Sequence, residues 1–477
     1  MSDPVPAMAD RASACAERVL AADSVVLASH IDADGLTSGA IAATALERAG
    51  IPFETTFEKQ LDAAAIDRIA ATDHEVALFT DFGSGQLDEI VPHHRAGEFD
   101  AVVADHHQPA TGKDGEEPPE IEHHLNPLLF GIDGAAELSG AGATYVLARA
   151  MERDGVDNRD LAALAVVGAV GDMQDTDGGL RGANEGVVAE GVDAGVIEEV
   201  TDISLYGRQT RPLPKLLEYA SELRIPGISG DEQGSIRFLS ELDVDLKVDG
   251  DWRRWVDLSF EERQTVASAL MRHAISRGVP PERVNSVTTT TYTLSAEEVG
   301  TELRDVSEFS TVLNATARYE RADVGLAVCL GYRDEALEEA RTLLRTHRRN
   351  LSEGLEWVKT EGVEQAEHLQ WFDAGTRIRE TIVGIIAGMA LGAEGVRRDQ
   401  PIIAFAQEND EELKVSGRGS GFLVNDGLDL SVVMSEAAAV VGGGGGGHDV
   451  AAGATIPREK RDAFLEEADR IVGEQLG

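Results

Sequence analysis

Short apolar runs alternate with segments of helical periodicity along the first 200 residues. The apolar runs predict buried strands and the periodic segments predict helices. In chain order these elements are expected at 24–29, 35–50, 75–81, 100–107, 139–155 and 159–175. Strands and helices that alternate in this way are typical of a parallel α/β sheet. The polar, proline-containing stretch 111–120 predicts a surface loop.

The pattern changes after residue 200 and returns near residue 400. A helix is expected at 261–278, whereas the β-branched run 286–294 fits no element clearly, and 333–362 predicts a long exposed helix that could connect two domains. The later strands and helices are expected at 401–407, 412–418, 428–441 and 457–477. The sequence thus predicts an α/β fold, with a parallel-sheet domain and a smaller α/β domain joined by a largely helical middle region.

Length and composition agree with several domains. A chain of 477 residues is too long for one ordinary core, and its hydrophobic content of 42 % is enough to build more than one. We expect boundaries that give domains at 1–200, 201–345 and 346–477.

Aspartate and histidine side chains follow each predicted N-terminal strand. Because the carboxyl ends of parallel strands share one edge of a sheet, side chains that follow them are expected to converge. A single aspartate after a strand is more often a turn or helix cap, so the prediction rests on the joint pattern. The set consists of His30, Asp32, Asp34, Asp81, Asp105, His106, His107 and, after a hydrophobic helix, Asp172.

Such a cluster requires a cation. Carboxylates that are packed together repel one another and take up protons unless positive charge lies between them. Aspartate together with imidazole suits Mn²⁺, and Mg²⁺ is the alternative where fewer imidazoles bind. The set holds more ligands than one ion needs, so we expect two ions bridged by one aspartate.

A run of six glycines at 442–447, followed by His448, is a second candidate site. A flexible linker is one interpretation. The run stands between a predicted helix and a predicted short strand, which favours phosphate binding through the backbone N–H groups and His448. The candidate residues are Gly445, Gly446, Gly447 and His448, together with Arg418 in the glycine-rich turn 416–421, whose guanidinium suits phosphate.

The chain is strongly acidic, with 86 acidic against 42 basic residues and a net charge of −44. Acidity that is spread along the chain, with only seven lysines, resembles the proteins of haloarchaea, where molar salt screens charges beyond about 3 Å. The alternative is an acidic protein that avoids nucleic acid. At high salt, bulk charge says little about nucleic-acid binding, and local arginines decide.

No membrane or secreted location is expected. The sequence has no run of about 18 apolar residues and no basic start followed by an apolar block. Its two cysteines, Cys15 and Cys329, build neither a disulfide framework nor a zinc site. A reducing cytoplasm is the expected location.

These residues resemble a known family. The segments HIDADG, TDFG, ADHH and GAVGDMQD resemble the four metal motifs of DHH-family phosphoesterases, and GGGGHDVAAG resembles the signature of the associated DHHA1 domain, which holds substrate. Residues 303–331 are similar to archaeal RecJ-like nucleases. The resemblance implies a Mn²⁺-dependent exonuclease that acts on single-stranded DNA or RNA in replication or repair.

The resemblance also implies a role for each residue. One Mn²⁺ would be held by Asp32 and Asp81, and a second by Asp34, Asp81, His106 and Asp172, with Asp81 bridging. Asp105 and His107 would orient ligands or handle protons. Many relatives have a histidine four residues before the first aspartate, where this chain has Ala28, so His30 is expected to take over as a ligand.

Two alternatives remain beside the exonuclease. One is a phosphodiesterase for short oligoribonucleotides, cyclic dinucleotides or nucleoside bisphosphates; the long region 201–345 favours the exonuclease over it. The other is a catalytically inactive replication scaffold, against which the complete carboxylate set argues. Bacterial RecJ carries a further oligonucleotide-binding domain, and we expect no counterpart of it in this sequence. Since archaeal relatives associate with the GINS complex of the replicative helicase, GINS is an expected partner.

Overall fold

The computed structural model describes residues 3–111, 118–153, 155–175, 178–220, 224–393 and 395–477. Most of the predicted loop 111–120 lies outside the described residues. The chain forms two compact units, Met1–Arg341 and Thr342–Gly477, here called the N-terminal and C-terminal units. The expected division into 1–200, 201–345 and 346–477 stays a prediction.

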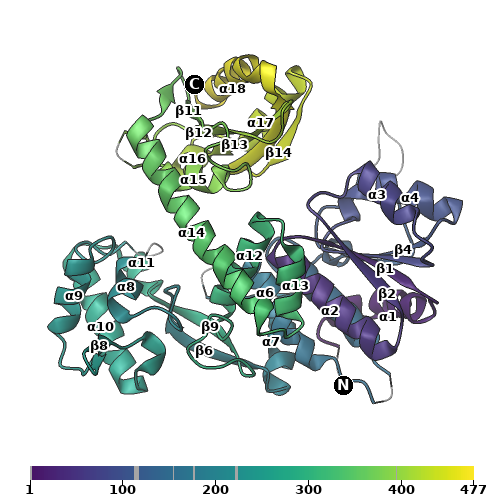
Figure 1. Cartoon of the computed structure of the whole chain (residues 1–477), viewed down its shortest axis with the longest axis horizontal. Coiled ribbons are helices and arrows are strands. Elements are labelled where there is room, and N and C mark those ends of the chain that lie inside the picture. Colours follow the sequence, from purple (N-terminus) through teal and green to yellow (C-terminus); the bar gives the residue numbers. More distant parts are fainter. Residues whose placement is uncertain (1–2, 112–117, 154, 176–177, 221–223, 394) are drawn as a thin grey trace. The chain divides into compact units, whose positions relative to one another are not determined.

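The N-terminal unit is built on a five-stranded sheet in the order β2-β1-β3-β4-β5, in which all neighbours are parallel (Figure 1). The central strands β1, β3 and β4 are the predicted apolar runs, and β3 is buried along its whole length. The edge strand β2 was not expected, because most of its residues are polar. The strands are β1 Val25–His30, β2 Phe53–Glu58, β3 Val76–Thr80, β4 Asp100–Ala104 and β5 His124–Leu125.

Helices cover both faces of this sheet. Alternate strand residues such as Val26, Phe79 and Val103 form a core with α3 and α4. Helices α1, α2 and α5 contact the strands as well. Of the helices α1 to α5, the sequence predicted α2 and α5, whereas α1, α3 and α4 were not expected. Their bounds are α1 Ala9–Leu20, α2 Ala33–Ala49, α3 Ala63–Ala70, α4 Leu87–Ala96 and α5 Gly140–Ala150.

A further layer of helices packs on α2. Helices α6 (Ala162–Gly171), α12 (Val306–Arg318) and α13 (Ala322–Cys329) contact α2, and α7 (Ala183–Asp193) contacts α6. Close packing depends on Gly168 of α6, where an added Cβ would lie 2.4 Å from Asp34 Oδ1 and 2.5 Å from Ala141 Cβ. Helix α12 also reaches the start of α2, because Asn314 Oδ1 accepts a hydrogen bond from the Ala33 N–H at 3.3 Å.

The middle region has its own core and is largely helical, as predicted. Trp255 and Leu270 are buried in a cluster formed mainly by its helices. The unassigned β-branched run forms strand β9 (Thr288–Leu294), which pairs antiparallel with β6 (Ile197–Ile203). The other elements are α8 Leu213–Glu218, α9 Glu232–Ser240, β7 Lys247–Val248, β8 Asp251–Trp252, α10 Phe260–Ser276 and α11 Pro281–Asn285.

Buried charges tie the middle region to α12. Arg208 forms an ion pair with Asp305, whose carboxylate caps the start of α12. Glu308, in the first turn, is fully buried and accepts hydrogen bonds from the Gln209 N–H at 2.9 Å and from the Thr210 hydroxyl. Burial, and then the Asp305 carboxylate, raise the pKa of Glu308 to about 7.

The C-terminal unit contains a six-stranded mixed sheet in the order β10-β11-β12-β13-β15-β14. The long predicted helix is α14 (Glu335–Glu361). The predicted fold class is therefore confirmed: a parallel-sheet α/β part, a smaller α/β unit and a largely helical region between them. The remaining elements are β10 Glu364–Gln365, β11 Gln370–Asp373, α15 Val383–Ala390, β12 Ile402–Gln407, β13 Glu412–Arg418, α16 Gly421–Asn425, α17 Leu430–Val440, β14 Gly444–Gly447, β15 Ala451–Pro457 and α18 Arg461–Leu476.

The glycine run is a strand, so the linker interpretation is wrong. Gly444–Gly447 forms the edge strand β14, which pairs with β15. An added Cβ at Gly445 would lie 2.5 Å from the Met434 carbonyl oxygen, so glycine is required there for the close approach of α17. An added Cβ at Gly444 or Gly446 would meet nothing within 4 Å. Gly445 thus serves packing, whereas Gly444 and Gly446 on either side of it face open space.

None of the helices that the structure describes is long and apolar enough to cross a membrane. Cys15 and Cys329 are both buried and free.

Candidate metal centre

The predicted ligands converge at the carboxyl end of the parallel sheet. They come from the end of β1, the start of α2, the residues after β3 and β4, and the end of α6. Potential ligand atoms lie within 4.8 Å of one another in each of three groups. The groups are His30, Asp32 and Asp81; Asp34, His106 and Asp172; and Asp81, Asp105, His106 and His107.

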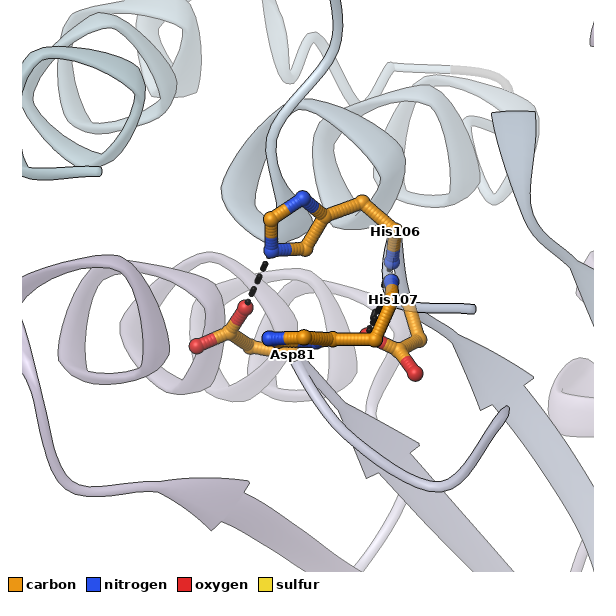
Figure 2. A group of neighbouring side chains, drawn as sticks. Asp81, His106 and His107 are labelled. Atoms are coloured by element: carbon orange, nitrogen blue, oxygen red, sulfur yellow. Dashed lines mark hydrogen bonds and ion pairs between the residues drawn. The ribbon is translucent and has the colours of Figure 1, made fainter. Parts of the chain in front are cut away.

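Asp81 stands between the first two groups. Its Oδ2 lies 3.5 Å from His30 Nδ1. Its Oδ1 faces His106 Nε2, at 3.3 Å (Figure 2). A further aspartate lies beside each histidine. Asp32 Oδ2 is 3.2 Å from His30 Nδ1, and Asp34 Oδ2 is 3.7 Å from His106 Nε2. Asp81 is buried and adopts a left-handed backbone conformation, with φ 61°, immediately after β3. The two oxygens of one carboxylate therefore face two different groups.

Burial and the mutual repulsion of carboxylates dominate the electrostatics of the cluster. Burial, and then the Asp81 carboxylate, raise the pKa of Asp34 well above its usual value. Burial raises the pKa of Asp172 to about 6, against the opposing effect of His106. Burial lowers the pKa of His106, but the carboxylates of Asp81, Asp34 and Asp172 together outweigh it and raise that pKa.

The donor atoms fit a divalent cation. Asp81 Oδ1 and His30 Nδ1 are buried and have no hydrogen-bond partner among the described residues. Buried polar atoms are rarely left without a partner, and a cation would supply one to both. Carboxylate and imidazole together suit Mn²⁺, and the mutual repulsion of Asp34, Asp81 and Asp172 would be relieved by it.

Helix α5 stabilises the buried Asp34 carboxylate. The N–H groups of Gly140 and Ala141, at the start of α5, donate to Asp34 Oδ2 and Oδ1 at 2.7 and 3.0 Å. A helix N-terminus carries partial positive charge and favours an anion. An added Cβ at Gly140 would lie 2.3 Å from Asp81 Oδ1, so only glycine fits beside both carboxylates. The predicted helix 139–155 gave no sign of this role.

Asp105 is fully buried and holds the turn after β4. Its Oδ1 accepts hydrogen bonds from the His106 N–H and His107 Nδ1 at 2.7 and 2.8 Å, and its Oδ2 accepts from the Ser84 N–H at 2.9 Å. Burial alone would raise the pKa of Asp105, but these partners, led by His107, lower it. Burial is likewise outweighed at His107, whose pKa the Asp105 carboxylate raises. The His107 side chain is half exposed.

A buried polar network behind this turn was not predicted. Ser84 Oγ lies 2.8 Å from His124 Nε2, and Asn126 Nδ2 donates to both Ser84 Oγ and the His107 carbonyl at 2.8 Å. Burial lowers the pKa of His124 to about 4, so its ring is neutral at pH 7. A histidine pair at 123–124 is the sequence signal for this network, and its His124 is buried behind the site.

Gln174 was also missed, and it orients the predicted ligand Asp172. Its Nε2 donates to Asp172 Oδ2 and to the Gly134 carbonyl, both at 2.9 Å, and its Oε1 accepts from Asn184 Nδ2 at 2.7 Å. The same Gly134 carbonyl lies 2.7 Å from His106 Nδ1. Because a carbonyl can only accept, Nδ1 carries a proton, so Nε2 is the nitrogen that would bind a cation, in place of a second proton.

The C-terminal candidates lie in the other unit. Arg418 ends β13 and pairs with Ala451 in the sheet register, while Gly447 pairs with Ala452, so Arg418 and His448 lie at the same end of that sheet. His448 is exposed. The Arg418 guanidinium lies against Gly384 of α15, where an added Cβ would be 2.5 Å from Nη2.

Comparisons with known proteins give the family. Residues 205–288 match the DHH-CID domain and residues 370–474 match the DHHA1 domain. An uncharacterized protein of Methanocaldococcus jannaschii is 30 % identical over 450 residues, which cover 94 % of this chain and 93 % of that protein.

Solved structures share the fold. RecJ from Thermus thermophilus in complex with Mn²⁺ gives a TM-score of 0.60 at 17 % identity, covering 99 % of this chain and 55 % of that chain. An exonuclease RecJ bound to manganese gives 0.59 at 17 % identity, with 98 % and 95 % covered. CDC45 from Entamoeba histolytica gives 0.60 at 11 % identity, with 97 % of each chain covered. The chain spans about half the length of the Thermus thermophilus RecJ. With its DHH-CID and DHHA1 domains matched and a relative that is 30 % identical over nearly the whole chain, the chain belongs to the family of DHH and DHHA1 domain proteins and has the fold of the RecJ and CDC45 structures.

Proposed function

We propose that this protein is a Mn²⁺-dependent phosphodiesterase that shortens single-stranded DNA or RNA from one end, in replication or repair. The observation that carries the proposal is Asp81, a buried carboxylate whose two oxygens face two separate ligand groups at 3.5 and 3.3 Å. A bridging position of this kind is what a two-ion site requires. Two of the similar RecJ structures are complexes with manganese, which supports the choice of ion, and Mg²⁺ remains the alternative.

Each predicted ligand would then bind at least one of the two ions. His30, Asp32 and Asp81 would hold one ion, and the other would be held by Asp34, Asp81, His106 and Asp172. Two bound ions would polarise the phosphodiester and lower the pKa of the attacking water.

The protein's own residues position the reacting groups. Asp105 fixes the His107 ring through Nδ1 at 2.8 Å, so that the half-exposed ring can hold or move a proton at its other nitrogen. In the C-terminal unit, the open backbone at Gly446, the exposed His448 and the Arg418 guanidinium would hold a phosphate of the substrate. Gly445 and Gly447 belong to the same strand, β14.

Further parts of the proposal rest on the resemblance. GINS is the proposed protein partner, and a haloarchaeal origin is proposed from the spread acidity and the net charge of −44. A phosphodiesterase for small substrates and an inactive scaffold are the competing functions.

One assay separates the three functions. The purified protein, in molar KCl with Mn²⁺, is given an end-labelled long single strand, a blunt duplex of the same sequence and a dinucleotide. We expect stepwise shortening of the single strand while the duplex is spared. His448→Ala should weaken binding of the long strand by only about 1–3 kcal/mol, because many other phosphates still contribute, and should harm the dinucleotide reaction far more.

Cleavage of the dinucleotide alone would replace the exonuclease with the small-substrate enzyme. No hydrolysis of any substrate, in a protein that binds Mn²⁺, would favour the scaffold.

A further inference from the structure

The C-terminal unit contains a cavity of about 380 Å³ that no part of the proposed reaction uses. One wall is a face of α14 with Asn350 and Trp357, which are seven residues apart and therefore on the same side of the helix. The opposite wall is the loop before α15, with Arg377 and Arg379.

The walls of this cavity are fixed by packing. Trp357 stacks edge to face on the buried Phe372, with the ring centroids 6.1 Å apart. Ile378 is only 3 % exposed and anchors the loop, while Arg377 and Arg379 on either side of it are exposed. The loop is further held by the Val383 N–H, which donates to the Arg379 carbonyl at 3.0 Å. The aromatic ring and the backbone that carries the two arginines are therefore held in place.

The chemistry of the lining is that of a nucleotide site. Among the described residues, the Arg377 guanidinium has no ion pair and no side-chain hydrogen bond, although the chain carries a net charge of −44. The one carboxylate of the lining, Glu353, lies 4.0 Å from Arg349. A guanidinium fork suits a phosphate, and the face of a tryptophan suits a nucleobase of any sequence.

We propose that this cavity binds one nucleotide unit of a single strand, with its phosphate on Arg377 and Arg379 and its base against Trp357. The inference rests on the proposed action on single strands and adds a second contact point for the strand. Ile382 lines the cavity two residues before Gly384, which contacts the Arg418 guanidinium. The cavity and the Arg418 site are thus neighbours along α15, within reach of one strand.

The test measures binding without cleavage. Anisotropy of a labelled single-stranded oligothymidylate is followed in EDTA over a range of salt concentrations. Arg377→Gln should weaken binding and reduce the slope of log K against log salt concentration by about 1, because one phosphate contact is lost. Trp357→Leu should weaken binding by roughly 5- to 150-fold and leave the slope unchanged, because stacking releases no counterion.

Arg470→Gln is the matched control. Arg470 lies on α18 in the same unit, is paired with Glu467 and Glu474, and does not line the cavity. It should leave both affinity and slope unchanged. Trp357→Phe keeps an aromatic wall and should retain most of the affinity, which guards against a folding defect in Trp357→Leu.

The outcomes are distinguishable. Wild-type affinity and slope in both Arg377→Gln and Trp357→Leu would overturn the site while leaving the proposed function intact. Wild-type affinity in Trp357→Leu, together with weaker binding and a reduced slope in Arg377→Gln, would overturn the nucleotide assignment, because the base would then make no contact in the cavity. A wild-type protein that binds no single strand would overturn the proposed function as well.

Discussion

The Nδ1 atom of His106 and the Nε2 atom of Gln174 share one acceptor, the Gly134 carbonyl oxygen, at 2.7 and 2.9 Å. The same Gln174 nitrogen donates to Asp172 at 2.9 Å. The buried Gln174 amide therefore orients Asp172 directly and shares its second acceptor with His106, so Gln174 is a positioning residue for the ion that these two predicted ligands would hold.

Gln174→Glu should weaken one of two Mn²⁺ sites by about 10–100-fold, the range found when a group that orients a ligand is lost. The substitution keeps the size of the side chain but places a carboxylate oxygen against the Asp172 carboxylate and the Gly134 carbonyl. Electron paramagnetic resonance of free Mn²⁺ during a titration measures both affinities. The control is Asn158→Ala, which removes a buried amide that donates to the Ala148 carbonyl and contacts no predicted ligand. Unchanged binding in Gln174→Glu would contradict the assignment.

Neighbouring glycines of β14 should respond in opposite ways to alanine. Gly445→Ala should lower the melting temperature, because the new Cβ would lie 2.5 Å from the Met434 carbonyl oxygen. Gly446→Ala should leave the melting temperature unchanged, since its Cβ would meet nothing within 4 Å, but should raise KM if a phosphate approaches this backbone. Thermal melting and steady-state kinetics on a single strand distinguish the two. An unchanged KM in Gly446→Ala would argue against phosphate binding by the strand.

Glu308 should make stability depend on pH. Its pKa is raised from 4.5 to about 7, by burial first and then by Asp305, so the folded state holds a proton that the unfolded chain releases. This contribution is fully present below about pH 4.5 and is lost as pH rises through about 7, with a slope of about 1.4 kcal/mol per pH unit between them. Between pH 5 and pH 8, the melting temperature of Glu308→Gln should change less than the melting temperature of the wild type. Parallel curves for the two proteins would show that Glu308 is ionised in the fold.

The net charge of −44 should make compactness depend on salt. At about 0.1 M salt the Debye length grows to about 10 Å. Surface carboxylates whose charges molar salt screens from one another then begin to repel. We expect near-ultraviolet circular dichroism to show loss of tertiary structure on dialysis from molar KCl to about 0.1 M. A melting curve that barely moves would remove the halophilic interpretation without affecting the proposed chemistry.

The elements that the sequence predicted are those whose own residues decide their structure. Strands β1, β3 and β4 are continuous apolar runs because both faces are buried. Edge strand β2 is mostly polar, and glycine strand β14 has low strand propensity and forms because α17 packs on it, so local sequence carried little signal for either.

The candidate site likewise contains residues that the sequence predicted and residues that it did not. The aspartates and histidines were found because each follows a recognisable strand or helix. The roles of Gln174 and Ser84 depend on contacts with Gly134 and Asp105, which are distant in the sequence. Such partners become visible only when the chain is folded.

The most direct test of the metal centre is the Mn²⁺-dependent rate at which Asp81→Asn shortens a labelled single strand, measured beside the wild type after removal of metal with EDTA. Asparagine suits this position because it tolerates the left-handed conformation, at φ 61°, better than alanine does. We predict that addition of Mn²⁺ restores cleavage in the wild type, while Asp81→Asn stays slower by several orders of magnitude and melts no earlier, because loss of its charge relieves repulsion from Asp34 and Asp172. A variant that cleaves at close to the wild-type rate would contradict the bridging role of Asp81 and with it the two-ion site.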